Sequence, residues 1–265
     1  MREDLDRGTA GDITTEAIIG NESGRAIITA NQAGVVSGLR IAAAVFARFD
    51  GALQFGARVD EGAEVESGRV IVELRGALKA ILTGERTALN FLSHLSGIAT
   101  LTAAFVAAAG RPAVKIFDTR KTTPGLRALE KYAVTVGGGH NHRFGLSDGV
   151  LIKDNHIVGR GVKTAVALVK EKLPTRTVEV EVDTLDQLAE ALAAGADIVL
   201  LDNMDIDMLK SAVKIAKGKV EIEISGGVGL DNIGAIAAVG PARISVGALT
   251  QNAAPLDFSL TVVGA

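Results

Sequence analysis

Cationic side chains are concentrated in one stretch of the sequence, residues 117–156, which also holds three of the four histidines. Its most suggestive cations stand beside glycines, threonines or short apolar runs rather than at helical spacing on a solvated face. They are Arg120, Lys121, His142, Arg143 and Lys153. Cations grouped in this way predict a site for an anionic ligand. The simpler alternative is that they are ordinary surface cations at the ends of secondary-structure elements.

Two acidic residues, Glu181 and Asp202, end neighbouring predicted strands. Carboxylates at one rim of a sheet can share a hard divalent cation, which keeps several waters and bridges the phosphates of a ligand. The same two acids could instead form ion pairs with Lys121 and Lys153. The residues alone leave both interpretations open.

Glycine-containing turns follow the last two predicted strands. Ser225, Gly226 and Gly227 come after one of them, and Gly247 ends the other. Glycine lets the backbone approach an anion closely and present free N–H groups to it. Each sequence taken singly is typical of a plain tight turn. Two in succession, at the end of a series of strands and helices, favour phosphate binding.

The elements that position these residues are predicted from hydrophobic periodicity and turn signals. After residue 112, strands alternate with helices, two of which have clear starts, a capping box at Thr184 and Gln187 and an N-cap at Asp205. The predicted strands are residues 114–118, 133–137, 149–154, 178–183, 198–202, 220–225 and 243–247. Repeated units of strand and helix predict a parallel sheet that closes, or nearly closes, into a barrel with its polar strand ends on one face.

The first part of the chain has a different pattern. Residues 12–75 predict a small module of short strands around a helix over residues 39–49, and a helical region follows over residues 83–109. Within that region Gly97 is a candidate break between two helices. We predict one domain over residues 1–110 and a barrel over residues 111–265, with a C-terminal tail that can return to the first domain.

Composition narrows the class of function. A net charge of −3 and an aromatic content of 3% disfavour nucleic-acid binding, and the absence of cysteine excludes disulfides and thiol catalysis. The N-terminal segment MREDLDRGTAGD lacks the basic and apolar regions of a signal peptide. No window reaches the roughly 18 uninterrupted apolar residues of a membrane span. We therefore expect a cytoplasmic protein without a nucleic-acid or membrane partner.

Successive motifs run in one order through nearly the whole chain, and DTRKTTPGLRALEKYAV is the most specific of them. The others are GERTALNFLSHLSGIAT, GGGHNHRFGLSDGVLIKDNHI, VEVEVDTLDQLAEALAAGADIVLLDNM, EISGGV and ISVGALTQNAAPLDFSL. Their residues and spacing resemble the signature blocks of the quinolinate phosphoribosyltransferases. The resemblance implies an α/β fold, with a small N-terminal α/β sandwich before a seven-stranded, TIM-like α/β barrel. It also implies an enzyme of NAD biosynthesis, which condenses quinolinate with phosphoribosyl pyrophosphate and releases carbon dioxide and pyrophosphate.

The resemblance assigns roles to individual residues. Those matched to the carboxylates of quinolinate are Arg120, His142, Arg143 and Lys153. Those matched to phosphoribosyl pyrophosphate and Mg²⁺ are Lys121, Glu181, Asp202, Ser225, Gly226, Gly227 and Gly247. Thr119 and Thr122 are expected to donate hydrogen bonds, and Arg86 to reach the site of a second subunit in a dimer or hexamer. The expected catalytic group is Lys121, Lys153, Glu181 and Asp202, in which the two acids are the magnesium ligands.

Two other functions are compatible with parts of this pattern. Cations specify an anionic ring poorly, so the residues also fit a related phosphoribosyltransferase for another aromatic acid. A non-catalytic sensor of phosphoribosyl pyrophosphate or of a nucleotide is the alternative outside enzymes. A sensor has no need to keep Arg120, Lys121, Lys153 and both rim acids together, which favours the enzyme.

Overall fold

The structure is a computed structural model that describes residues 4–5 and 11–264. The predicted absence of a signal peptide concerns a segment that lies largely outside the described residues. The chain forms two compact units, one of residues 1–101 with 253–265 and one of residues 102–252. The division falls inside helix α3 (Leu78–Ala109) rather than at its C-terminal end.

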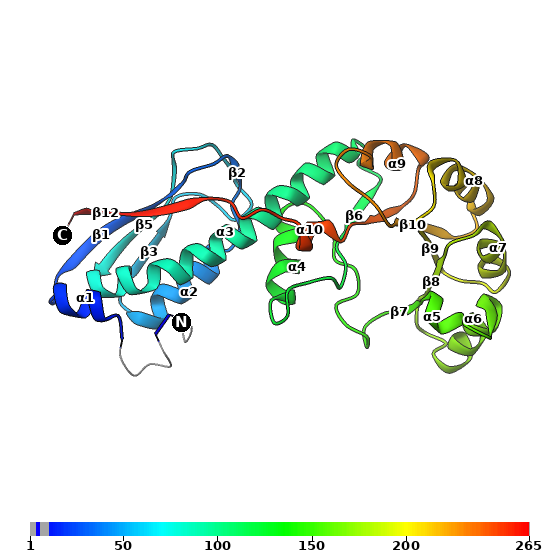
Figure 1. The fold of residues 1–265 in the computed structure, drawn as a ribbon, viewed down its shortest axis with the longest axis horizontal. Coiled ribbons are helices and arrows are strands. Elements are labelled where there is room, and N and C mark those ends of the chain that lie inside the picture. The colour runs from blue at the N-terminus through cyan, green and yellow to red at the C-terminus, as the bar shows by residue number, and fades with distance from the viewer. Residues whose placement is uncertain (1–3, 6–10, 265) are drawn as a thin grey trace. The chain divides into compact units, whose positions relative to one another are not determined.

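Unit 1 is built on an antiparallel sheet of four strands in the order β12-β1-β5-β3 (Figure 1). These strands are β1 (Ser23–Ala30), β3 (Gln54–Ala57), β5 (Arg69–Ala77) and β12 (Phe258–Gly264). A second pairing joins β2 (Gly34–Val35) to β4 (Glu64–Val65), and helix α1 (Ile13–Ile18) precedes β1. The C-terminal tail therefore supplies an edge strand of the first sheet.

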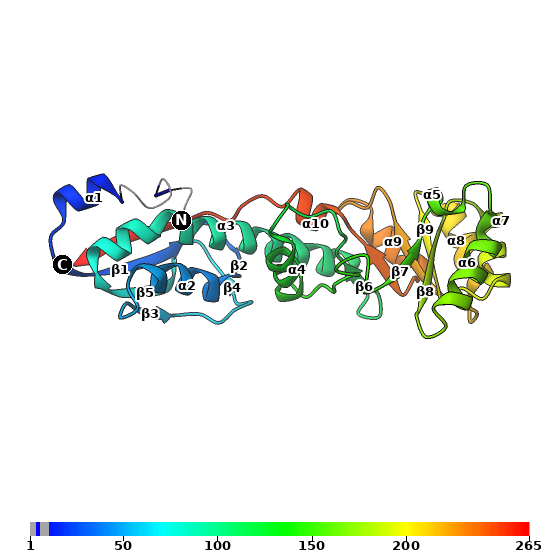
Figure 2. The ribbon, with the colours of Figure 1, turned by 90° about the horizontal axis from the view of Figure 1, so that it is seen from below.

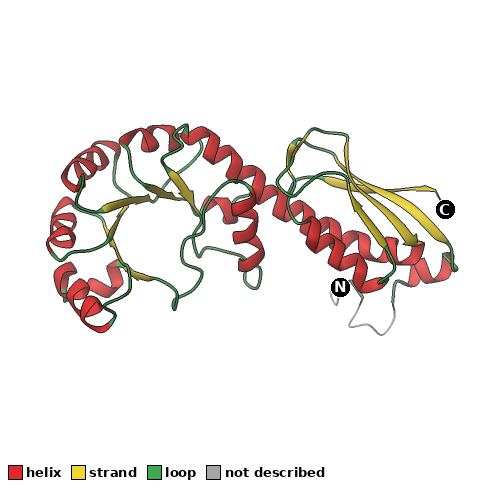
Figure 3. Ribbon diagram, turned by 180° about the vertical axis from the view of Figure 1, so that it is seen from behind, coloured by secondary structure: helices red, strands yellow, loops and turns green. Residues whose placement is uncertain are grey.

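Helices α2 (Leu39–Phe49) and α3 cover one face of this sheet (Figure 3). The predicted helix over residues 39–49 is confirmed. α3 is long and apolar enough to cross a membrane by length and composition, yet Leu89 and Leu92 are buried in the core of unit 1, as in the core helix of a globular protein. Gly97 does not break α3. A Cβ atom there would lie 2.2 Å from the carbonyl oxygen of Ala254, so the glycine allows close packing.

Unit 2 is a parallel sheet of six strands in the order β6-β11-β10-β9-β8-β7, with helices outside it (Figures 1 and 2). Its strands are β6 (Lys115–Phe117), β7 (Val150–Ile152), β8 (Val178–Val182), β9 (Ile198–Asp202), β10 (Glu221–Ser225) and β11 (Arg243–Ser245). Its helices are α4 (Arg127–Val136), α5 (Asp154–Ile157), α6 (Gly161–Lys172), α7 (Leu185–Ala193), α8 (Ile206–Ala216), α9 (Ile233–Val239) and α10 (Ala248–Gln251). The predicted α/β class, with a small domain and a barrel-like one, is confirmed.

One predicted strand is wrong, because residues 133–137 lie in helix α4 and at its C-cap. On the side of β6 that faces away from β11, Phe117 instead forms a single parallel bridge with His140. The rings of these two residues are stacked at 5.4 Å. The segment at His140 thus takes the place that a seventh strand would have beside β6.

The predicted helix starts are confirmed where side chains cap them. Thr184 accepts a hydrogen bond from the backbone N–H of Gln187 at the start of α7, and Asp205 does the same for two N–H groups of α8. These caps begin each helix directly after a strand that carries a rim acid. They therefore fix where β8 and β9 end.

Candidate active site

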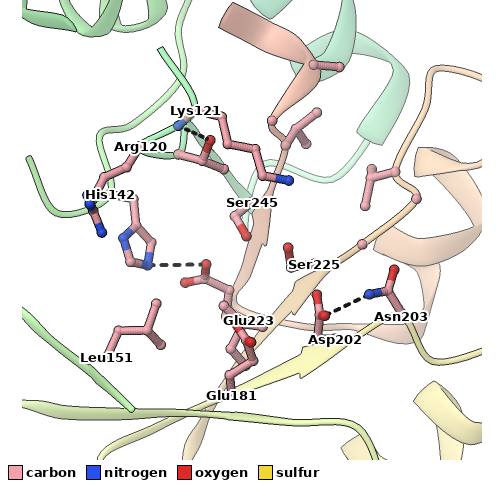
Figure 4. Close-up of a pocket in the computed structure, with 18 of the residues that line it drawn as sticks. Arg120, Lys121, His142, Leu151, Glu181, Asp202, Asn203, Glu223, Ser225 and Ser245 are labelled. Carbon is pink, nitrogen blue, oxygen red and sulfur yellow. Dashed lines mark hydrogen bonds and ion pairs between the residues drawn. The ribbon is translucent and has the colours of Figure 1, made fainter. Parts of the chain in front are cut away.

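A cavity of about 620 Å³ opens at the carboxyl ends of the parallel strands of unit 2 (Figure 4). It is lined from the strands and from the loops that adjoin them. This is the face on which the polar strand ends were predicted to converge. The lining residues are Thr119, Arg120, Lys121, His142, Arg143, Leu151, Lys153, Glu181, Leu200, Asp202, Asn203, Glu223, Ser225, Gly226, Gly227, Val228, Ser245, Val246, Gly247, Ala248 and Gln251.

All but two of the predicted site residues line this cavity. The first exception is Thr122, whose hydroxyl oxygen accepts a hydrogen bond from Arg127 Nε at 2.9 Å. The second is Arg86, an exposed residue of α3 in unit 1. Residues that lie far apart in the sequence are thus brought together by the fold.

The two arginines of the lining make few interactions with the described residues. Arg120 Nε is buried and has no hydrogen-bond partner among the described residues. Burial lowers the pKa of the Arg143 guanidinium, and the neighbouring charge of Arg120 lowers it further. The Arg143 guanidinium donates one hydrogen bond among the described residues, from Nη1 to the carbonyl oxygen of Gly149 at 3.0 Å. Two guanidinium groups held near each other with donors to spare favour an anionic ligand.

The two rim acids differ in their surroundings. Glu181 forms an ion pair with Lys153, as the alternative interpretation of the sequence required. Asp202 accepts a hydrogen bond from Asn203 Nδ2 at 2.7 Å instead. Both offer carboxylate oxygens that can ligate a metal ion, lie on the adjacent strands β8 and β9, and line the open cavity. This set of donors fits a hard divalent cation such as Mg²⁺, which prefers carboxylate oxygens and water.

Asn203 is held in an uncommon conformation. Its φ of 53° makes it the only residue other than glycine with a positive φ among residues 4–5 and 11–264. Asparagine tolerates this left-handed region better than most residues. The turn brings the Asn203 side chain onto Gly226, where a Cβ atom would lie 2.2 Å from Asn203 Oδ1. Gly226 and Asn203 together therefore hold the backbone beside Asp202.

Replacing Gly226 by alanine is expected to destabilise unit 2 by about 3 kcal/mol, because strain at a positive φ adds to the clash with Asn203. Gly227→Ala is a matched control, since its φ of 60° is also positive but its Cβ would meet no atom within 4 Å. That variant should lose about 1 kcal/mol. Urea unfolding measured by circular dichroism compares the two. Equal losses would show that contact with Asn203 is not what requires Gly226.

Sequence reasoning missed one buried acid of the cavity lining, Glu223. Glu223 of β10 is 0% exposed, and neither of its carboxylate oxygens has a hydrogen-bond partner among the described residues. Burial and, second, the nearby charge of Glu179 raise the pKa of Glu223 from 4.5 to about 7. Glu179 of β8 is also buried, and His142 Nε2 lies 3.1 Å from its Oε2.

His142 links this acidic pair to the cavity wall. Its Nε2 lies 3.5 Å from Glu223 Oε1, while its Nδ1 accepts a hydrogen bond from the backbone N–H of Arg143 at 2.9 Å (Figure 4). Burial lowers the pKa of His142, but Glu179 and then Glu223 raise it by more. The three side chains are close enough to ligate a metal ion, with ligand atoms within 4.8 Å of one another. In the neutral ring, however, the proton is on Nε2 because Nδ1 accepts, so the cluster is arranged to hold protons.

The raised pKa of Glu223 predicts a pH-dependent stability. Between about pH 4.5 and pH 7 the folded protein keeps a proton that the unfolded chain has lost, so Glu223 reduces stability as the pH rises through that window. Glu223→Gln removes this titration. Relative to the wild type, the variant should gain up to about 3 kcal/mol between pH 4.5 and pH 7.5. Unfolding in urea at a series of pH values measures the difference, and a difference that is constant with pH would contradict the assignment.

The fold and the cavity define an α/β-barrel enzyme that binds anionic substrates at the carboxyl ends of its strands. The chain belongs to the quinolinate phosphoribosyltransferase family. The model of that family's N-terminal domain matches residues 12–96, and the model of its C-terminal domain matches residues 98–261.

Individual relatives match nearly the whole of this chain. The chain is 42% identical to the nicotinate-nucleotide pyrophosphorylase (carboxylating) of Mycobacterium leprae, over 98% of this chain and 93% of that protein. It is 38% identical to a quinolinate phosphoribosyltransferase (decarboxylating) of Nicotiana glauca, over 97% of this chain and 79% of that protein. The solved structure of NadC from Streptococcus pyogenes superposes with a TM-score of 0.94 at 42% identity, covering 99% of this chain and 94% of that one.

Proposed function

We propose that the cavity of unit 2 carries out phosphoribosyl transfer from phosphoribosyl pyrophosphate to quinolinate, with decarboxylation, in NAD biosynthesis. The products are nicotinate mononucleotide, pyrophosphate and carbon dioxide. The observation that carries the proposal is the division of the cavity lining. The guanidinium groups of Arg120 and Arg143 lie near each other in one part. In another part Lys121 lies beside Gly247, and Asp202 is in register with Ser225 before the glycine turn. Such a lining suits a ring with two carboxylates beside a phosphorylated sugar.

Arg120, Arg143 and Lys153 bind the two carboxylates of quinolinate in this proposal. Arginine forks bind carboxylates through paired hydrogen bonds, which fixes the plane of the ring as well as its position. The unpartnered Nε of Arg120 supplies one such donor. His142 lines the same cavity and contacts the buried acids Glu179 and Glu223. Thr119 lies beside Arg120 in the lining and offers a hydroxyl.

The phosphoribosyl end is assigned to the opposite part of the lining. Lys121 lies against Gly247, where a Cβ atom would approach its side chain to 3.1 Å, so the glycine leaves room for the lysine. Ser225, Gly226 and Gly227 present a turn whose two glycines have φ of 91° and 60°. Glu181 and Asp202 are the proposed ligands of Mg²⁺, which when bound neutralises charge on the pyrophosphate group.

The reaction itself needs orientation and charge more than covalent chemistry. The ring nitrogen of quinolinate forms a bond to the anomeric carbon of the ribose as the bond to pyrophosphate breaks. The anomeric carbon carries positive charge in the transition state, which the rim carboxylates stabilise. The ring nitrogen then becomes cationic, so the bond to the adjacent carboxylate can break. Carbon dioxide leaves, its bonding electrons remain on the ring carbon, and that carbon takes up a proton.

The decisive experiment is incubation of the purified protein with quinolinate, phosphoribosyl pyrophosphate and Mg²⁺, followed by detection of nicotinate mononucleotide. Nicotinate and phthalate in place of quinolinate are the matched controls. Product from nicotinate but not from quinolinate would move the assignment to a non-decarboxylating enzyme. Binding of phosphoribosyl pyrophosphate with no product from any aromatic acid would favour a sensor.

We also propose that the enzyme is a cytoplasmic homodimer or a larger assembly in which Arg86 of one subunit serves the cavity of another. Arg86 is exposed on α3 and is not among the residues that line the cavity of its own chain. An exposed arginine within a motif shared with the family is consistent with a role outside its own subunit.

Mixing Arg86→Ala chains with Lys153→Ala chains tests this shared site. Each variant alone should be nearly inactive, whereas a heterodimer would contain one site with both residues intact. Recovery of about a quarter of wild-type activity is expected if exchange is random and each dimer holds two independent sites. No recovery, after native mass spectrometry has shown subunit exchange, would argue against an active site shared between subunits.

A further inference from the structure

Arg127, the first residue of α4, joins two segments that are distant in the sequence. Its Nε donates to Thr122 Oγ1 at 2.9 Å, and its Nη2 donates to the carbonyl oxygen of Arg120 at 3.4 Å. Its Nη1 donates to the carbonyl oxygen of Phe144 at 3.1 Å. These partners are neutral oxygens of loops, and no acid forms an ion pair with Arg127 among the residues described. The guanidinium therefore acts as a cross-link between residues 119–123 and 142–145.

The two segments carry cations that repel each other. Arg120 belongs to one and Arg143 to the other, and the charge of Arg120 contributes to the lowered pKa of Arg143. Like charges favour separation of the two segments when no anion lies between them. Arg127 of α4, which forms hydrogen bonds to both segments, opposes that separation. Because its partners are neutral oxygens, the cross-link adds no acid that would compete with an anionic ligand.

We propose that Arg127 is a positioning residue that sets the spacing between Arg120 and Arg143 and thereby selects a planar ligand with two neighbouring carboxylates. This inference rests on the proposed function, since it assigns those two arginines to quinolinate. A guanidinium is suited to the task because its planar fork reaches several acceptors at fixed angles, which lysine cannot do. Nothing in the proposed chemistry requires Arg127 to touch the substrate.

A second contact shows which ligand Arg127 should leave unaffected. Thr250 of α10 donates from Oγ1 to the carbonyl oxygen of Lys121 at 2.6 Å. The segment 119–123 is thus held from two sides, by Arg127 next to Arg120 and by Thr250 at Lys121. The first contact lies on the side proposed for quinolinate. The second lies on the side proposed for phosphoribosyl pyrophosphate.

Steady-state kinetics with both substrates test the proposal. Arg127→Ala is expected to raise KM for quinolinate about tenfold, equivalent to about 1.4 kcal/mol, with KM for phosphoribosyl pyrophosphate changed less than about twofold. Thr250→Val, which keeps the shape but removes the hydroxyl donor, should show the reverse selectivity. Arg127→Lys should remain closer to Arg127→Ala than to the wild type. Millimolar methylguanidinium should restore Arg127→Ala in part, because it replaces the missing fork. Arg176→Ala, an exposed arginine of the same unit, is the control for loss of charge.

Hydrogen exchange gives a readout that does not depend on catalysis. Amides in residues 119–123 and 142–145 should exchange faster in Arg127→Ala, while those in residues 225–229 should be unchanged. Equal effects on both substrates, or unchanged exchange in both segments, would overturn the positioning role. If the wild-type protein does not convert quinolinate, the proposed function fails. In that case, unchanged amide exchange in Arg127→Ala would reject the cross-link itself. Faster exchange in both segments would support the cross-link but not the assignment of its ligand as quinolinate.

Discussion

Arg120→Ala is expected to lower kcat/KM for quinolinate about a thousandfold, because it removes two charge-assisted hydrogen bonds that contribute about 1.5–3 kcal/mol each. The Nε of Arg120 is buried and has no hydrogen-bond partner within residues 4–5 and 11–264. A donor in that condition has little stabilising role in the ligand-free protein. It acquires one when a carboxylate accepts its hydrogen bond. The variant should therefore lose activity while its unfolding midpoint stays within about 2 °C of the wild type.

Three further measurements test whether the loss of activity comes from the Arg120 fork. Arg111→Ala removes an exposed arginine from the same unit, away from the cavity, and should have wild-type kinetics. Arg120→Lys keeps the charge but loses the fork, and should recover only a small part of the activity. Saturation with quinolinate should restore more of the rate than saturation with phosphoribosyl pyrophosphate. Wild-type turnover by Arg120→Ala would remove Arg120 from the site.

The sequence was informative about the site because a parallel barrel converts strand ends into neighbours. Asp202 and Ser225 were each recognised as the last polar residue of a hydrophobic run, and Glu181 as an acid near the end of another. Residues Asp202 and Ser225 are indeed in register across β9 and β10. Periodicity is enough for this step, since parallel strands of similar length align their carboxyl ends. It does not give the directions of side chains, so the roles of these residues remain predictions.

Helix α4 was misread because its buried face is charged. Glu130 and Lys131 are buried together with Ala133 and Val134, so the apolar residues that remain do not repeat at helical spacing. What does stand out is a β-branched run that ends in three glycines, which is typical of a strand. The buried side chains of Glu130 and Lys131 bind the neighbouring loops. Glu130, for example, accepts a hydrogen bond from the backbone N–H of Thr123 at 3.1 Å.

Glu223 was missed for a related reason. Alternation of acid and apolar residues along β10 normally indicates one face in water, but Glu223 is buried like Ile222 and Ile224, and only Glu221 at the start of the strand is exposed. A strand with a neighbour on each side and helices outside has no solvated face except at its end. Glu223 and Glu179 must therefore point into the barrel, where only another charged or polar group can stabilise them. His142 supplies that group, which explains why a loop residue reaches so far inward.

Helix α4 also carries the residue, Lys131, whose substitution has the largest expected effect on stability. Lys131→Met should reduce the free energy of unfolding of unit 2 by about 3–5 kcal/mol, because it leaves the carboxylate of Asp118 buried without its cation. Asp118 is 0% exposed and Lys131 is 2% exposed on the side chain, and they form an ion pair. Lys131 also donates to the carbonyl oxygen of His142 at 3.0 Å, and Asp118 accepts from the backbone N–H of His142 at 2.9 Å. The pair thus fastens the loop that carries His142 and Arg143 to the end of β6.

Removing the second charge separates electrostatics from packing. Asp118→Asn still accepts from the backbone of His142 but carries no charge, so the double variant Asp118→Asn/Lys131→Met should recover at least half of the stability lost by Lys131→Met alone. The chain has one tyrosine and no tryptophan, and that tyrosine, Tyr132, lies on α4. Its fluorescence in urea therefore reports on unit 2 specifically. If the double variant is as unstable as Lys131→Met, the lysine acts through its hydrogen bond to His142 and its packing rather than through its charge.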